Sequence, residues 1–200
     1  MDVEHNQGVE IEAVPASGGA SRRGGAIWQA GYAVSVLALA ALIALLAGAV
    51  AAGLQARRDE ARSADMLLIV APALPSQTLS EHAFAVYRRR YAPTVVIAGA
   101  GSEALRIALI ERGAAEETLR VALPAATPVA ELQEVLRSAR RAGAASALVV
   151  AEPAELLLWL KLVGDHGLSA YGAPPRGVTP GPLALLRASG QYWRYALLQR

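Results

Sequence analysis

One long stretch of the chain, from Gly24 to Leu54, contains no charged residue. About 20 apolar residues are enough to cross the hydrocarbon core of a bilayer, so this stretch is long enough to span it. Trp28 and Tyr32 lie near one end of the stretch, where interfacial aromatic residues are common. We therefore predict a single-pass transmembrane helix over residues 26–54, with the lipid bilayer as its first partner.

Two other interpretations of this stretch are a buried core helix and a cleaved signal peptide. A signal peptide has a shorter apolar region, about 7 to 15 residues, and starts close to the N-terminus. Here the apolar region is longer and begins further along the chain, although Ala49-Val50-Ala51 matches the small-residue pattern of a cleavage site. The length of the apolar region favours an uncleaved anchor.

The charges beside the predicted helix give little information on its orientation. Arg22 and Arg23 precede it, whereas Arg57, Arg58 and Arg62 follow it. Cytoplasmic flanks carry the excess of Lys and Arg, so this count favours a cytoplasmic C-terminal side by one arginine.

Outside this helix the chain divides into three further parts. Residues 1–25 have the composition of a disordered tail, residues 55–64 form a polar linker, and residues 65–200 have the size of one domain. The chain contains no cysteine, which excludes disulfides and thiolate metal sites. The formal net charge is only +2 and the arginines form no stripe, so we expect no nucleic-acid partner.

Residues 65–200 alternate between short apolar runs and segments with helical spacing. The runs predict strands over 66–70, 94–97, 119–123, 147–150 and 168–171. The spacing predicts helices over 79–90, 102–112, 129–141, 155–166 and 183–198, with Gly113, Gly143 and Gly167 ending the second, third and fourth. This order predicts an α/β fold, a Rossmann-like three-layer domain with a mostly parallel five-stranded sheet.

Ligands bind such folds beyond the carboxyl ends of the strands. After the second strand, Gly99-Ala100-Gly101-Ser102-Glu103-Ala104 fits G-x-G-x-x-A, in which glycine lets the backbone approach a phosphate. A dinucleotide fingerprint follows the first strand and needs an acidic residue after the next one, so we expect no nucleotide cofactor. A tight strand-to-helix turn and an anion site are equally good interpretations of this motif.

The weak catalytic candidates are glutamates. Glu131 lies one turn into a helix that Thr127 can cap, and Glu152 and Glu155 open the helix after the fourth strand. An acid/base pair would need such carboxylates, but acidic residues at helix N-termini also simply suit the helix dipole, which is the favoured interpretation. None of the three histidines directly follows a strand, and we expect no metal site.

The order of these pieces resembles the YdcF/SanA/ElyC-like family of bacterial envelope proteins, from Asp65 to the C-terminus. The matching positions are Asp65 with MLLIV, Ala83, Val86, Tyr87, Arg88 to Pro93, TVVIA, Gly99, Glu103, Ala104, Glu111 to Ala114, Thr127, Glu131, Leu148, Glu152, Pro153, Gly167, Leu168, Tyr171, Gly172, Pro174, Tyr192, Trp193 and Tyr195. The resemblance implies a domain outside the cytoplasm, on the plasma membrane, with a role in peptidoglycan or lipid-carrier metabolism.

This sequence departs from the family pattern at several polar positions. Where members carry glycine, S-G-G, Asn, His, Arg and an acid, the chain has Ala71-Pro72, Ala98-Gly99-Ala100, Leu132, Glu155, Leu158 and Ala188. Three functions are then open. The first is binding of an anionic small molecule or lipid-linked sugar, with Gly99, Gly101, Ser102, Glu103 and Thr127 as the ligand site. The second is a hydrolase or transferase that acts on such a metabolite.

The third function is an interaction module that uses the aromatic C-terminal helix. Tyr192, Trp193 and Tyr195 would then lie at the bilayer surface, where Trp and Tyr are enriched. Large aromatic side chains more often pack in cores, so we expect Trp193 to pack on the sheet.

Overall fold

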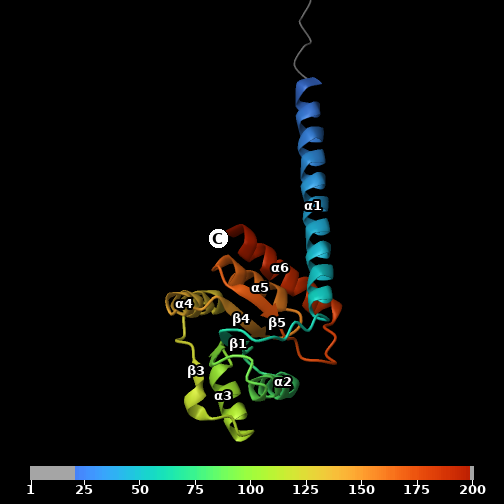
Figure 1. Ribbon diagram of the computed structural model, residues 1–200. Helices are drawn as coiled ribbons and strands as arrows, with labels where there is room; N and C mark the ends of the chain where they lie inside the picture. The colour runs from blue at the N-terminus through green and yellow to red at the C-terminus, as the bar shows by residue number, and fades with distance from the viewer. Residues whose placement is uncertain (1–20, 199–200) are drawn as a thin grey trace, which may run out of the picture. The chain divides into compact units, whose positions relative to one another are not determined.

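The computed structural model describes residues 21–198, with side chains from residue 32 onward, and divides at Leu42 into two compact units. Helix α1 (Ser21–Gln55) provides the described part of the first unit and continues into the second, which holds the α/β domain (Figure 1). The predicted disordered tail covers residues 1–25, and its first 20 residues lie outside the described part of the chain. Helix α1 begins five residues before the predicted start of the spanning helix.

Helix α1 is long and apolar enough to cross a membrane over Tyr32–Gln55. Only 6% of its most apolar window is buried, whereas a core helix is buried over most of its length. The chain therefore has one helix, among the described residues, with the length and composition of a membrane span. Residues 56–65 form neither helix nor strand and connect it to the sheet.

The sheet has five strands, all parallel, in the order β3-β2-β1-β4-β5. The strands are β1 (Met66–Val70), β2 (Thr94–Ala98), β3 (Leu119–Val121), β4 (Ser146–Val150) and β5 (Ser169–Gly172). Helices cover both faces of this sheet, as the alternation in the sequence predicts. The α/β fold class is therefore confirmed.

Alternate residues of β1 point to two separate hydrophobic cores. Leu68 contributes to the core under α4 (Pro128–Arg141) and α5 (Leu156–Asp165), which Tyr195 also joins. Ile69 contributes to the core under α2 (Gln77–Arg88) and α3 (Ser102–Glu111). Because both faces are covered, every residue of β1 is buried, which explains its continuous apolar sequence.

Local chemistry sets most helix ends. Ser76 caps α2 by accepting a hydrogen bond from the Leu79 amide, and Thr127 caps α4 in the same way through the Ala130 amide. Each glycine predicted to end a helix follows it with a positive φ, namely Gly113, Gly143 and Gly167. Strand β3 is two residues shorter than predicted, because Leu123 lies beyond the last pairing and is exposed.

The C-terminal helix α6 (Pro182–Leu198) packs against the end of α1, within the second unit. The Trp193 indole Nε1 donates a hydrogen bond to the Ala44 carbonyl at 2.9 Å, and Ser189 Oγ donates to the Leu45 carbonyl at 2.8 Å. The prediction that Trp193 packs on the sheet is therefore wrong. Its backbone acceptor lies on α1, and Tyr195 is the aromatic residue of α6 that enters the core.

Candidate functional site

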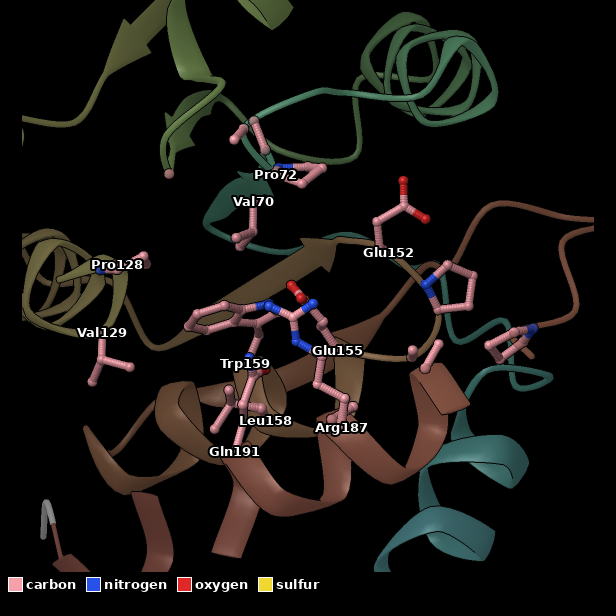
Figure 2. A pocket seen from close by; sticks show the side chains of 18 of the residues that line it. Val70, Pro72, Pro128, Val129, Glu152, Glu155, Leu158, Trp159, Arg187 and Gln191 are labelled. Atoms are coloured by element: carbon pink, nitrogen blue, oxygen red, sulfur yellow. The ribbon is translucent and has the colours of Figure 1, made fainter. Parts of the chain in front are cut away.

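A cavity of about 890 Å³ lies at the carboxyl edge of the sheet. Its walls come from the ends of β1 and β4, from the segments that follow β2 and β3, and from α6 (Figure 2). Strands β1 and β4 are the neighbours at which the strand order changes direction, which is the usual ligand position in an open α/β sheet. The cavity is therefore the candidate functional site.

The glycine turn after β2 meets the cavity only at its edge. Gly99 lines the cavity, whereas Gly101, Ser102 and Glu103 do not. Gly99 has a φ of 101°, and a Cβ there would collide with the Ala71 carbonyl oxygen. A Cβ on Gly101 would collide with the Pro72 carbonyl in the same way. These two glycines let the β2 turn pack against the segment after β1.

The backbone donors of this turn already have partners in the protein. The Gly101 amide points to the Ala71 carbonyl at 3.4 Å, and the Ser102 amide donates to the Gly99 carbonyl at 3.0 Å. The Glu103 carboxylate forms an ion pair with Arg106 at 2.6 Å on the outer surface of α3. In the structure the motif is a tight turn, and its amides would have to give up these bonds to hold an anion.

Glu131 is the buried carboxylate at this turn. It is 7% exposed, and its Oε1 accepts a hydrogen bond from the Gly99 amide at 2.7 Å. Thr127 lines the cavity, but its hydroxyl caps α4. Both side chains therefore stabilise the turn and the helix that border the site.

The glutamates after β4 lie within the cavity wall. Glu152 Oε1 accepts a hydrogen bond from Ser76 Oγ at 2.9 Å, which links the β4 segment to the cap of α2. Burial raises the pKa of Glu155 above its ordinary range, and the negative charge of Glu152 adds to this effect. Contact with the Trp159 side chain and the positive charge of Arg187 act against it. Glu155 thus holds a proton more readily than an ordinary glutamate does.

Three side chains converge in the middle of the cavity. Figure 2 shows the Glu155 carboxyl, the Trp159 indole and the Arg187 side chain close together, the first two from the β4–α5 segment and the third from α6. Trp159 is 5% exposed, and its Nε1 has no hydrogen-bond partner of ordinary geometry in the described structure. The Glu155 carboxyl interacts with this N–H only with poor geometry, so a ligand oxygen that aligned better with it would stabilise it.

The remaining cavity wall is mainly apolar. The residues of this wall include Val70, Pro72, Pro128, Val129, Pro153, Ala154, Leu158, Val178, Pro180, Leu183 and Ala188. Arg187, Gln191 and Arg194 add polar groups from α6. Such a surface suits a ligand with an apolar body and a polar end.

Sequence reasoning missed Ser76, Trp159, Arg187 and Arg194. Trp159 lies four residues after Glu155 on the first turns of α5, so helical spacing could have placed the two together. No local signal indicates the other three, because their positions depend on how α2 and α6 pack.

The histidines lie elsewhere. His82 makes a hydrogen bond with the Ala173 carbonyl at 3.1 Å, and His166 makes one with the Leu162 carbonyl at 2.9 Å. Burial lowers the pKa of His82. From residue 21 to 198, no group of three or more His, Cys, Asp or Glu side chains is placed to hold a metal ion.

Comparisons with models of protein families, with curated proteins and with solved structures find no match to this chain.

Proposed function

We propose that this chain is a membrane-anchored ligand-binding protein of the bacterial cell envelope, a divergent relative of the YdcF/SanA/ElyC-like family. Its α/β domain lies on the extracytoplasmic side of the plasma membrane and binds an anionic, lipid-linked envelope metabolite without transforming it. The ordered resemblance from Asp65 onward supports the family and the side of the membrane. Helix α1 supports the anchor.

The observation that carries the binding function is the cavity at the carboxyl edge of the sheet. Its apolar walls offer a place for an isoprenoid or acyl segment, and the buried Trp159 N–H faces the polar side chains at its centre. Arg187 and Arg194 lie seven residues apart on α6, which places them on one face of the helix. Two arginines on one face suit a phosphate group.

Three observations favour binding over catalysis. Glu131, which a reaction would need as a free carboxylate, already accepts the Gly99 amide. Glu152 is likewise engaged with Ser76. The family's polar positions on this edge are occupied by apolar side chains such as Leu132 and Leu158, which are buried.

A short isoprenyl phosphate tests this function. We expect full-length protein in detergent to bind farnesyl phosphate, with a change in tryptophan fluorescence as the signal, and to bind farnesol and inorganic phosphate more weakly. Arg187→Gln removes a charged partner of the phosphate, so its dissociation constant is expected to rise about tenfold. Arg137→Gln, on the surface of α4 and paired with Glu134, is the matched control. Equal binding of farnesol and farnesyl phosphate contradicts an anionic ligand.

The second candidate function is a hydrolase or transferase on the same class of metabolite. Its support is Glu155, a half-buried cavity carboxyl whose pKa is raised by desolvation, which is a common feature of general acids. Release of phosphate from farnesyl phosphate by the wild type, and loss of that release in Glu155→Gln with binding retained, would replace the binding function by this one.

The side of the membrane has its own test. A topology reporter fused after Arg200 is expected to give the extracytoplasmic signal. A cytoplasmic signal would place the domain on the other side and remove the envelope function, but it would leave ligand binding by the cavity untouched.

A further inference from the structure

The end of α1 and helix α6 contact each other around Gly48. Ser189 and Trp193 of α6 donate hydrogen bonds to the Leu45 and Ala44 carbonyls. A Cβ at Gly48 would come within 3.0 Å of Trp193 Nε1 and still closer to the Ser189 hydroxyl, so this glycine is needed for the close approach. Because higher numbers on α6 meet lower numbers on α1, the two helices run antiparallel.

The sides of this pair that face away from the contact are apolar and exposed. On α1 the exposed side chains are Ile43, Leu46, Val50 and Leu54, and on α6 they are Leu183, Leu186, Leu197 and Leu198. Leu197 is 74% exposed, although Tyr195 and Ala188 of the same helix are buried. Leucines clustered in this way on a helix surface mark an interaction site more often than they mark bare surface.

The length of the uncharged stretch indicates which partner covers this surface. The apolar span of α1 from Tyr32 to Gln55 has 24 residues, a length of about 36 Å, whereas a hydrocarbon core is about 30 Å thick. Helix α6 contacts α1 at Ala44, Leu45, Gly48 and Gly53, in the second half of this span. The partner that covers the exposed sides of both helices there is the lipid leaflet.

The sequence of α6 suits that depth. It contains Arg187 and Arg194 but no acidic residue, and Tyr192 and Trp193 carry amphipathic rings. Long arginine side chains can reach headgroups from a helix whose leucines contact lipid tails. The charge of the helix is thus complementary to an anionic lipid surface.

We propose that α6 is an interfacial membrane helix, which inserts Leu186 and Leu197 into the leaflet beside the end of α1. Arg194 then lies at the level of the lipid phosphates, whereas Arg187 faces Glu155 in the cavity. Because α6 also forms one wall of the cavity, this wall lies at the membrane surface. The proposal does not depend on which ligand the cavity takes.

Site-specific fluorescence in vesicles tests the proposal, and the absence of cysteine from the sequence makes the labelling clean. Leu186→Cys and Leu197→Cys are labelled with an environment-sensitive fluorophore in the full-length protein. The matched control is Leu123→Cys, an 82% exposed leucine beyond β3. The vesicles contain phosphatidylcholine and phosphatidylglycerol, with nitroxide-labelled lipid as the quencher.

We expect blue-shifted emission and loss of fluorescence to the nitroxide lipid at positions 186 and 197, with neither at position 123. Without phosphatidylglycerol the loss is expected to fall, because Arg194 loses its anionic partners. Emission and quenching at 186 and 197 equal to those at 123 would place α6 in water and overturn the proposal. A blue shift that depends on protein density and shows no nitroxide quenching would assign the surface to a second copy of the chain, which also overturns it.

Discussion

Two glutamates near the carboxyl edge of the sheet have different surroundings: Glu131 is buried behind the turn that follows β2, and Glu155 lines the cavity after β4. After β2, the Gly99 amide donates a hydrogen bond to the Glu131 carboxylate, which lies on α4. After β4, Glu155 is half-buried beside the Trp159 indole, and this burial raises its pKa. The two carboxylates therefore differ both in exposure and in the groups that contact them.

Their interactions separate their roles. The Glu131 carboxylate accepts a short hydrogen bond from the Gly99 amide and so links α4 to the turn after β2. Partial burial of the Glu155 carboxyl favours its protonated form, which suits a group that exchanges a proton with a ligand. The β2 segment is accordingly the rigid side of the cavity, and the β4 segment is the side on which a ligand can change the protonation state.

The largest expected effect comes from the rigid side. Gly99→Ala places a Cβ against the Ala71 carbonyl at a φ of 101°, so the unfolding free energy is expected to fall by about 3 kcal/mol. Denaturant unfolding of the full-length protein in detergent, followed by tryptophan fluorescence, measures this loss.

Gly164→Ala is the matched control, because a Cβ there meets open space within helix α5. This substitution is expected to raise stability by up to about 1 kcal/mol, since alanine is the better helix former. If Gly99→Ala proved as stable as the wild type, the β2 turn would be adaptable, and its contrast with the β4 segment would be lost.

The second effect concerns the hydrogen bond to the turn. Glu131→Ala leaves the Gly99 amide buried without its acceptor and is expected to cost about 2 kcal/mol of unfolding free energy. Glu131→Gln keeps an acceptor oxygen and should recover most of this loss. The same denaturant titration measures both variants.

Glu134→Ala, on the same helix but exposed and paired only with Arg137 and Arg141, is expected to stay within about 0.5 kcal/mol of the wild type. An equal loss in Glu131→Ala and Glu134→Ala would mean that the bond to Gly99 contributes nothing specific.

The local structure on the β2 side of the cavity was easier to predict than the arrangement on the β4 side. Apolar runs such as MLLIV and TVVIA, with glycines after the helices, gave the strands and helix ends because these signals are local. The motif at Gly99 indicated either a turn or an anion site. In the structure the motif is a tight turn. The motif alone could not indicate why glycine is needed there, because the carbonyls that exclude a Cβ belong to residues 71 and 72, far away in sequence.

The cavity could be predicted only in part. Glu152 and Glu155 follow a buried strand, so their place at the carboxyl edge follows from the pattern. The contribution of α6 does not, because helical periodicity cannot show that its polar face closes a cavity. Trp193 illustrates the same point, since aromatic residues usually join cores but this one finds its acceptor on α1.

The smallest expected effect is a pH dependence on the β4 side. Burial raises the pKa of Glu155, so the folded state holds this proton more tightly than the unfolded state does. The resulting stabilisation is complete below the ordinary glutamate pKa, about 4.3, and is lost as pH rises through the folded-state value. Glu155→Gln lacks this loss, so its stability relative to the wild type is expected to increase from acidic to neutral pH.

Asp65 provides the control of opposite sign. Hydrogen bonds from the Ala145 amide and from Ser146 lower the pKa of Asp65, so its stabilisation is present above the ordinary aspartate pKa and is lost as pH falls. Asp65→Asn should therefore be less stable than the wild type at neutral pH, and the difference should shrink in acid. Urea titrations of both variants across this pH range measure the two slopes. Slopes of the same sign would show that hydrogen-bond donors, rather than burial, govern the titration of Glu155, and its contrast with Asp65 would disappear.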